Sequence, residues 1–205
     1  MPKRRLFAIV TILLLSSSAW ASPISFIYTG VGSGSLGPLA FSDAAFTITA
    51  SADTDDRQHR NSGNGFFINH TSVAIDIAGL GSANFLTGTR TFVNNDIASV
   101  GFSLAGSSGW DLYDSFDDPA YGAWDMLSAI GPIAGSFDLL QWDDSPVNTD
   151  LGTLSFVTAL TAGSFQATTA VPEPATAILI PFAAAAFSAV FGARRRSKFA
   201  CRTSQ

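Results

Sequence analysis

A nineteen-residue stretch without a charged side chain, positions 175–193, constrains the fold of this chain most strongly. At about 1.5 Å per residue, a helix over this stretch is about 28 Å long, close to the roughly 30 Å hydrocarbon core of a membrane. Arg194, Arg195 and Arg196 follow it directly. Because basic residues beside a span stay in the cytoplasm, the sequence predicts a transmembrane helix at 175–193, a stop-transfer element at 194–196 and a cytoplasmic tail at 197–205. The preceding chain then lies outside. A packed helix of a soluble domain is the alternative.

The N-terminus has the three parts of a secretory signal peptide. Lys3, Arg4 and Arg5 form a basic start, and an apolar run follows at 6–15. Small residues at Ala19 and Ala21 then match the two positions that signal peptidase reads. We therefore predict a signal peptide at 1–21 that is cut after Ala21. An uncleaved anchor or a buried helix is the alternative. The paired arginines also leave the twin-arginine export route open beside the general secretory route.

The order of features at the C-terminus resembles the PEP-CTERM sorting signal over residues 171–196. A Pro-Glu-Pro motif comes first, then the hydrophobic stretch, then the arginine cluster; the motif residues are Val171, Pro172, Glu173 and Pro174. The resemblance implies that an exosortase, a membrane-embedded enzyme, recognises Pro172, Glu173 and Pro174 and processes the chain near them. It also implies that the helix anchors the protein only transiently. The protein then goes to the cell surface or to the exopolysaccharide matrix.

The region between these ends, residues 22–170, is strongly acidic. Fifteen aspartates stand against three arginines, Arg57, Arg60 and Arg90, which gives a net charge of −12. Nucleic acid and anionic membrane surfaces are poor partners for such a surface, whereas calcium or a neutral polysaccharide is compatible with it. The region contains no cysteine, because the single Cys201 lies in the predicted tail. An exported domain of this composition folds without disulfides and depends on its apolar core.

Short apolar or alternating runs, separated by Gly, Ser, Asn and Asp, recur throughout 22–170. They predict strands at 24–28, 45–50, 66–68, 73–77, 91–93, 100–104, 137–140, 154–160 and 165–169. No convincing helical stripe occurs in this region. We predict a mostly β fold: one exported domain built as an antiparallel β-sandwich or jelly roll. Residues 161–170 form either its last strand or a short tether.

Two motifs in this region suggest binding sites. The glycines of 32–37 match a dinucleotide-binding pattern, but Pro38 and a β-type run follow where that site needs a helix. We interpret them as a glycine-rich hairpin. Acidic residues cluster at 53–56, 111–118 and 143–144. Calcium takes six to eight oxygen ligands, often from loops, and the favoured set is Asp111, Asp114, Asp117 and Asp118. Solvated turn aspartates are the alternative, and no other cofactor is expected.

The inventory for catalysis is small. His59 and His70 are the only histidines, and no G-x-S-x-G sequence or thiol accompanies them. We interpret both as exposed loop residues and predict that the protein is not an enzyme. Trp110, Trp124 and Trp142 are expected in the core, although an exposed indole can stack on a sugar ring.

Together these features predict an exported, exosortase-processed surface or extracellular-matrix protein that is structural or associated with exopolysaccharide. Its partners are signal peptidase and the exosortase, the membrane through the C-terminal helix, and exopolysaccharide. The alternative is a secreted carbohydrate-active hydrolase that uses paired aspartates.

Overall fold

The computed structural model describes residues 22–61, 63–106, 109–142, 144 and 147–169. The chain divides between Ala170 and Val171 into two units, and all described residues belong to the first. The predicted signal peptide, the Pro-Glu-Pro motif, the helix at 175–193 and the arginines that follow it lie outside the described residues. Within the described part, no helix is long and apolar enough to cross a membrane.

The described chain is built almost entirely of strands. In order they are β1 (Pro23–Leu36), β2 (Leu39–Asp53), β3 (Gln58–His59), β4 (Gly65–Asn69), β5 (Ser72–Ile77), β6 (Gly81–Asn84), β7 (Thr89–Asn94), β8 (Ser99–Leu104), β9 (Asp111–Ser115), β10 (Ile130–Leu139), β11 (Val147–Thr149), β12 (Gly152–Phe156) and β13 (Ala159–Thr169). Two single-turn 3-10 helices, η1 (Thr54–Asp56) and η2 (Tyr121–Ala123), interrupt them.

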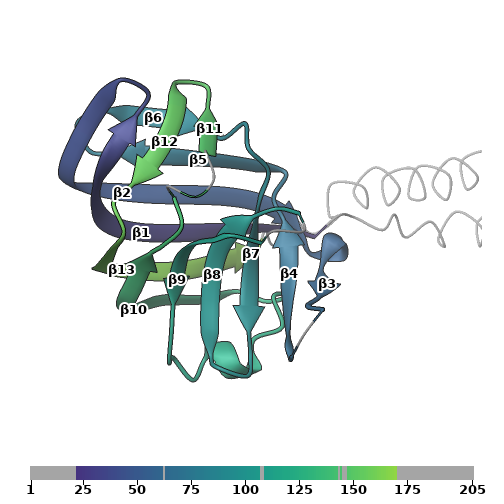
Figure 1. Ribbon diagram of the computed structural model, residues 1–205. Helices are drawn as coiled ribbons and strands as arrows, with labels where there is room; N and C mark the ends of the chain where they lie inside the picture. The colour runs from purple at the N-terminus through teal and green to yellow at the C-terminus, as the bar shows by residue number, and fades with distance from the viewer. Residues whose placement is uncertain (1–21, 62, 107–108, 143, 145–146, 170–205) are drawn as a thin grey trace, which may run out of the picture. The chain divides into compact units, whose positions relative to one another are not determined.

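All thirteen strands join one antiparallel sheet. Its main order is β3-β4-β7-β8-β9-β10-β13-β1-β2-β5-β6, and the β11–β12 hairpin attaches to β1. The sheet curls into a half-barrel. Figure 1 shows β1 and β2 running across the view while β4, β7, β8 and β9 run up it. Strands far apart in the sheet order therefore enclose a common interior.

The interior is filled by the inward face of each strand. β1 alternates buried and partly exposed positions, as a half-buried strand should, and Ile24, Phe26 and Tyr28 point inward. Aromatic rings from the two arms of the curled sheet meet there. The Tyr28 ring lies 5.7 Å from the Phe102 ring, in an edge-to-face arrangement. Trp124 and Trp142 are buried in the same core, as predicted, and Trp110 is packed against it.

The prediction of a mostly β, antiparallel fold is confirmed. Seven of the nine predicted strands lie wholly within observed ones, and 161–170 contributes the last strand rather than a tether. The glycines of 32–37 lie at the end of β1 and in the turn into β2, so no helix follows them.

The predicted strand at 154–160 is wrong, because the chain leaves the sheet at Val157 and Thr158 between β12 and β13. Both of these strands pair with β1, β12 at Gly34–Leu36 and β13 at Ile24–Thr29. A register shift in β1 separates the two pairings. One apolar run therefore supplies two successive neighbours of one long strand.

Candidate functional site

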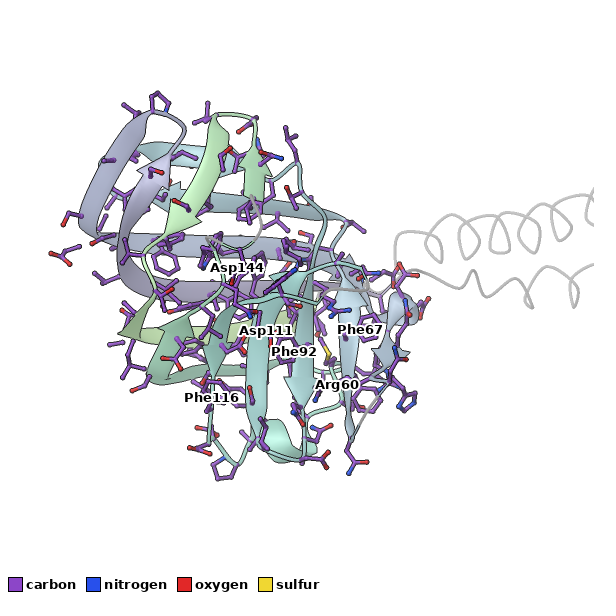
Figure 2. All side chains as sticks on the ribbon, viewed as in Figure 1. Arg60, Phe67, Phe92, Asp111, Phe116 and Asp144 are labelled. Atoms are coloured by element: carbon purple, nitrogen blue, oxygen red, sulfur yellow. The ribbon has the colours of Figure 1, made fainter. Side chains whose placement is uncertain are left out.

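A pocket of about 240 Å³ lies on the outer face of β4, β7, β8 and β9. Its lining residues come from three separate parts of the chain and are Arg60, Asn61, Phe67, Arg90, Phe92, Gly109 and Asp111. Figure 2 shows Arg60, Phe67, Phe92 and Asp111 over these strands. The pocket thus gathers two of the three arginines of the acidic domain.

Sheet register brings these residues together. Phe67 on β4 is paired with Phe92 on β7, and Arg90 is paired with Ser103 on β8, which is in turn paired with Asp111 on β9. Because side chains alternate along a strand, Arg90 and Phe92 project from the same face. The two phenylalanines form one row of that face, and Arg90, Ser103 and Asp111 form the next.

Packing against the sheet holds both guanidinium groups. The Arg90 guanidinium lies over the Phe67 ring, 4.9 Å from its centroid, and Nε donates a hydrogen bond to Ser103 Oγ at 3.0 Å. The Arg60 guanidinium lies 5.8 Å from the centroid of the Phe92 ring. Such cation–π contacts restrain a flexible side chain and leave its outer N–H groups available.

The two pocket arginines have no carboxylate within ion-pair distance among the described residues. The one ion pair found there joins Arg57 to Asp125 at 3.8 Å, outside the pocket. Burial raises the pKa of the Asp111 carboxyl, and the Arg90 and Arg60 guanidiniums act in the opposite direction. Burial also lowers the pKa of Arg90, although arginine stays charged at physiological pH. With Asp111 ionised, the three charged side chains of the pocket sum to one positive charge.

The four aspartates predicted to bind calcium do not converge. Asp111 lines the pocket and Asp114 is buried, both on β9, whereas Asp117 and Asp118 lie in the loop that follows. Asp118 accepts a hydrogen bond from the Ala120 N–H at 2.9 Å, as a turn aspartate does. Across the described residues, no group of three or more His, Cys, Asp or Glu is arranged to hold a metal. The calcium prediction gains no support from this arrangement.

Asp114 is an unusual carboxyl group. Its side chain lies beside Gly101 on the outer face, is only 3 % exposed, and its Oδ1 has no hydrogen-bond partner among the described residues. Burial, together with the nearby Asp111 and Asp138 carboxylates, holds the pKa of Asp114 well above its usual range. Burial therefore favours the protonated, neutral form of the Asp114 carboxyl relative to an exposed aspartate.

The two histidines have different environments. Both were predicted as exposed loop residues. His59 is exposed but lies on the short edge strand β3, whereas His70 lies in the loop between β4 and β5, as predicted, but is half-buried. The His70 ring stacks on Phe102, and its Nδ1 and Nε2 lie 2.9 Å from the hydroxyls of Thr89 and Thr91. Burial lowers the pKa of His70 to about 3. Both ring nitrogens are occupied by threonine hydroxyls, and the half-buried ring packs on the core residue Phe102, so His70 has a structural role.

Sequence reasoning did not identify the pocket. Two signals were available: basic residues are rare in 22–170, and Arg90 directly precedes the predicted strand at 91–93, two positions from Phe92. This chain matches no protein-family model, no curated protein and no solved structure.

Proposed function

We propose that this chain is an exported protein of the PEP-CTERM type, displayed at the cell surface or in the extracellular matrix, where its β domain associates with exopolysaccharide without catalysis. In this proposal, signal peptidase removes 1–21, the helix at 175–193 holds the chain in the inner membrane with the domain outside, and an exosortase processes the chain near Pro172, Glu173 and Pro174.

The pairing of Ile24 with Thr169 carries the proposal. β1 begins at Pro23, just after the predicted signal-peptidase cut, and β13 ends at Thr169, just before the sorting motif. The two strands are neighbours in the sheet. Removing both predicted end segments therefore removes none of the strands that the structure describes and breaks no pairing between them. This agreement between the limits of the folded domain and the predicted cuts is what processing at both ends requires.

The proposal includes the finer description of the domain as sandwich-like or jelly-roll-like. Its support is that the two arms of the curled sheet pack face to face. Besides Tyr28 and Phe102, Phe46 on β2 packs 5.4 Å from Tyr113 on β9. Sheet-on-sheet packing of this kind fills the core of a β-sandwich.

Two observations favour binding over hydrolysis. Glycoside hydrolysis generally uses two carboxyl groups across the scissile bond, and Asp111 is the one carboxylate among the residues lining the pocket described above. His70 is held by threonine hydroxyls rather than poised beside a serine. The net charge of −12 also disfavours nucleic acid as a partner.

The location of the protein tests this proposal. We would express the wild-type chain and a variant with Pro172, Glu173 and Pro174 all replaced by alanine in an exopolysaccharide-producing host that carries an exosortase. The wild type should reach the surface or matrix fraction, and the variant should stay in the membrane fraction. Recovery of both chains from the membrane would contradict the proposal.

A further inference from the structure

We propose that the pocket lined by Arg60, Arg90 and Asp111 binds the carboxylate of a uronic-acid-type sugar residue. The choice of a sugar as the ligand rests on the proposed association with exopolysaccharide. The anion site itself rests on the geometry of the pocket alone.

The arginines identify the site as one for an anion. Both guanidiniums are held over phenylalanine rings, and neither has a carboxylate within 4.0 Å among the described residues. The domain contains fifteen aspartates, yet neither Arg60 nor Arg90 forms an ion pair with any described one, Asp111 in the same pocket included. Planar guanidinium groups match the two oxygens of a carboxylate and form charge-assisted hydrogen bonds with it.

The arrangement is organised in advance of binding. Arg90 is fixed by Phe67 below it and by its hydrogen bond to Ser103. At Gly109, a Cβ atom would lie 2.5 Å from Arg90 Nη2, so a side chain there would displace the guanidinium. The glycine therefore leaves room for that group at the pocket. Binding to side chains that are already restrained costs less conformational entropy than binding that must first order them.

The charge of the pocket selects among anions. Two guanidiniums and one carboxylate leave a single positive charge, which a monoanion neutralises. A dianion such as sulfate overcompensates that charge and is repelled by the Asp111 carboxylate. A zwitterionic amino acid has no net charge, so it leaves the positive charge of the pocket uncompensated. At physiological ionic strength, charges beyond about 8 Å are largely screened. Asp114 lies near enough to interact with Arg60 and Asp111, and Asp111 is the one aspartate among the lining residues. The other aspartates therefore weaken this local attraction without removing it.

The remaining polar groups suit a hydroxylated ligand. Asp111 can accept hydrogen bonds from sugar hydroxyls, and the Asn61 amide can donate or accept them. A volume of about 240 Å³ is below the range typical of drug-sized ligands. One sugar ring of a polymer fits this size better than an extended chain segment.

Calorimetric titration of the full-length chain in detergent tests the assignment. Sodium galacturonate is the probe, and galactose provides a matched sugar without the carboxylate. Galacturonate should bind at least tenfold more tightly than galactose. Arg60→Gln should weaken galacturonate binding about tenfold or more, because a hydrogen bond to a charged group is lost. Arg57→Gln removes the same charge outside the pocket and should leave binding unchanged. Equal melting temperatures for the wild type and Arg60→Gln would show that the fold persists.

Three results would overturn the inference: no galacturonate binding at millimolar concentrations, equal binding of galactose, or equal loss in both arginine variants. Glycine or sulfate binding as tightly as galacturonate would overturn the choice of a uronic acid. None of these results concerns export or sorting. Failure of the proposed function would instead appear as a wild-type chain retained in the membrane fraction, whatever the pocket binds.

Discussion

The Tyr28 hydroxyl on β1 lies 3.0 Å from the Gly101 carbonyl oxygen on β8, although β9, β10 and β13 lie between these two strands in the sheet. The same hydroxyl lies 3.0 Å from Thr91 Oγ1 on β7. Both contacts cross the interior and are buried. They join the two arms of the curled sheet by a polar link within a largely apolar core.

Replacing Tyr28 by phenylalanine should therefore destabilise the domain while keeping its shape. The ring contacts with Phe102 and Phe165 remain, but the polar link to Gly101 and Thr91 is lost. A buried acceptor left without a partner costs about 1–3 kcal/mol. Urea unfolding should show a fall of that size in the free energy of unfolding. An unchanged value would mean that this cross-core link does not contribute to stability.

His70 should make stability depend on pH below neutrality. Its pKa is about 3 in the folded domain, against about 6.5 when unfolded. The unfolded chain therefore binds the extra proton between these values, so stability is full above pH 6.5 and falls as the pH drops towards 3. From pH 6.5 to pH 4 the loss is roughly 3 kcal/mol.

Melting temperatures of the wild type, His70→Asn and His59→Asn between pH 7 and pH 4 test this expectation. The exposed His59 is the matched control, so its variant should lose stability with acid as the wild type does. The His70→Asn variant should show a distinctly smaller acid-dependent fall. Parallel curves for all three proteins would contradict the assignment.

Asp114 should make the stability of the domain fall as the pH rises, the opposite of the effect of His70. Its folded pKa lies well above the unfolded value of about 3.9. Stabilisation from the neutral carboxyl is therefore full below pH 3.9 and is lost as the pH rises through the folded pKa. Asp114→Asn removes this titration, so relative to the wild type the variant should gain stability from pH 4 to pH 8. The exposed Asp43→Asn serves as the control, and the same gain in that variant would contradict the prediction.

Gly101 should tolerate no side chain. A Cβ at this position would meet the Phe92 ring and Asp114 Oδ1, whereas a Cβ at Gly135 on β10 would meet nothing within 4 Å. Overpacking of this kind typically costs about 1–3 kcal/mol. Chemical denaturation should therefore show Gly101→Ala to be destabilised by that amount and Gly135→Ala to be little changed. Equal effects would indicate that the outer face adjusts freely around β8.

Local pattern was sufficient to predict the β class and most strands, because short apolar runs recur between turn residues and 46–49 and 73–77 carry a clear period of two. It was not sufficient for β9. Leu112 and Tyr113 are buried within that strand, but Asp111 and Asp114 flank them, so the segment has the composition of a loop. A carboxyl group whose pKa is raised by burial cannot be distinguished in sequence from a solvated one.

The pocket depends on which strands become neighbours, and short-range pattern does not contain that information. Phe67 lies beside Phe92 because β4 pairs with β7, although β5 and β6 lie between these two strands in the sequence. Arg60 and Asp111 join them from a loop and from another strand, each with no distinctive sequence around it. The end segments, in contrast, were predicted from charge and apolar length alone, and they lie outside the described residues.

Intact mass spectrometry of the chain from hosts with and without the exosortase is the decisive test of processing at both ends. Loss of 1–21 is expected in both hosts. Loss of the segment after the Pro-Glu-Pro motif is expected only when the exosortase is present, which leaves the domain from Ser22 to Thr169 whole. A mature chain that keeps the 175–193 segment in both hosts would contradict the proposed processing and indicate an ordinary membrane-anchored protein.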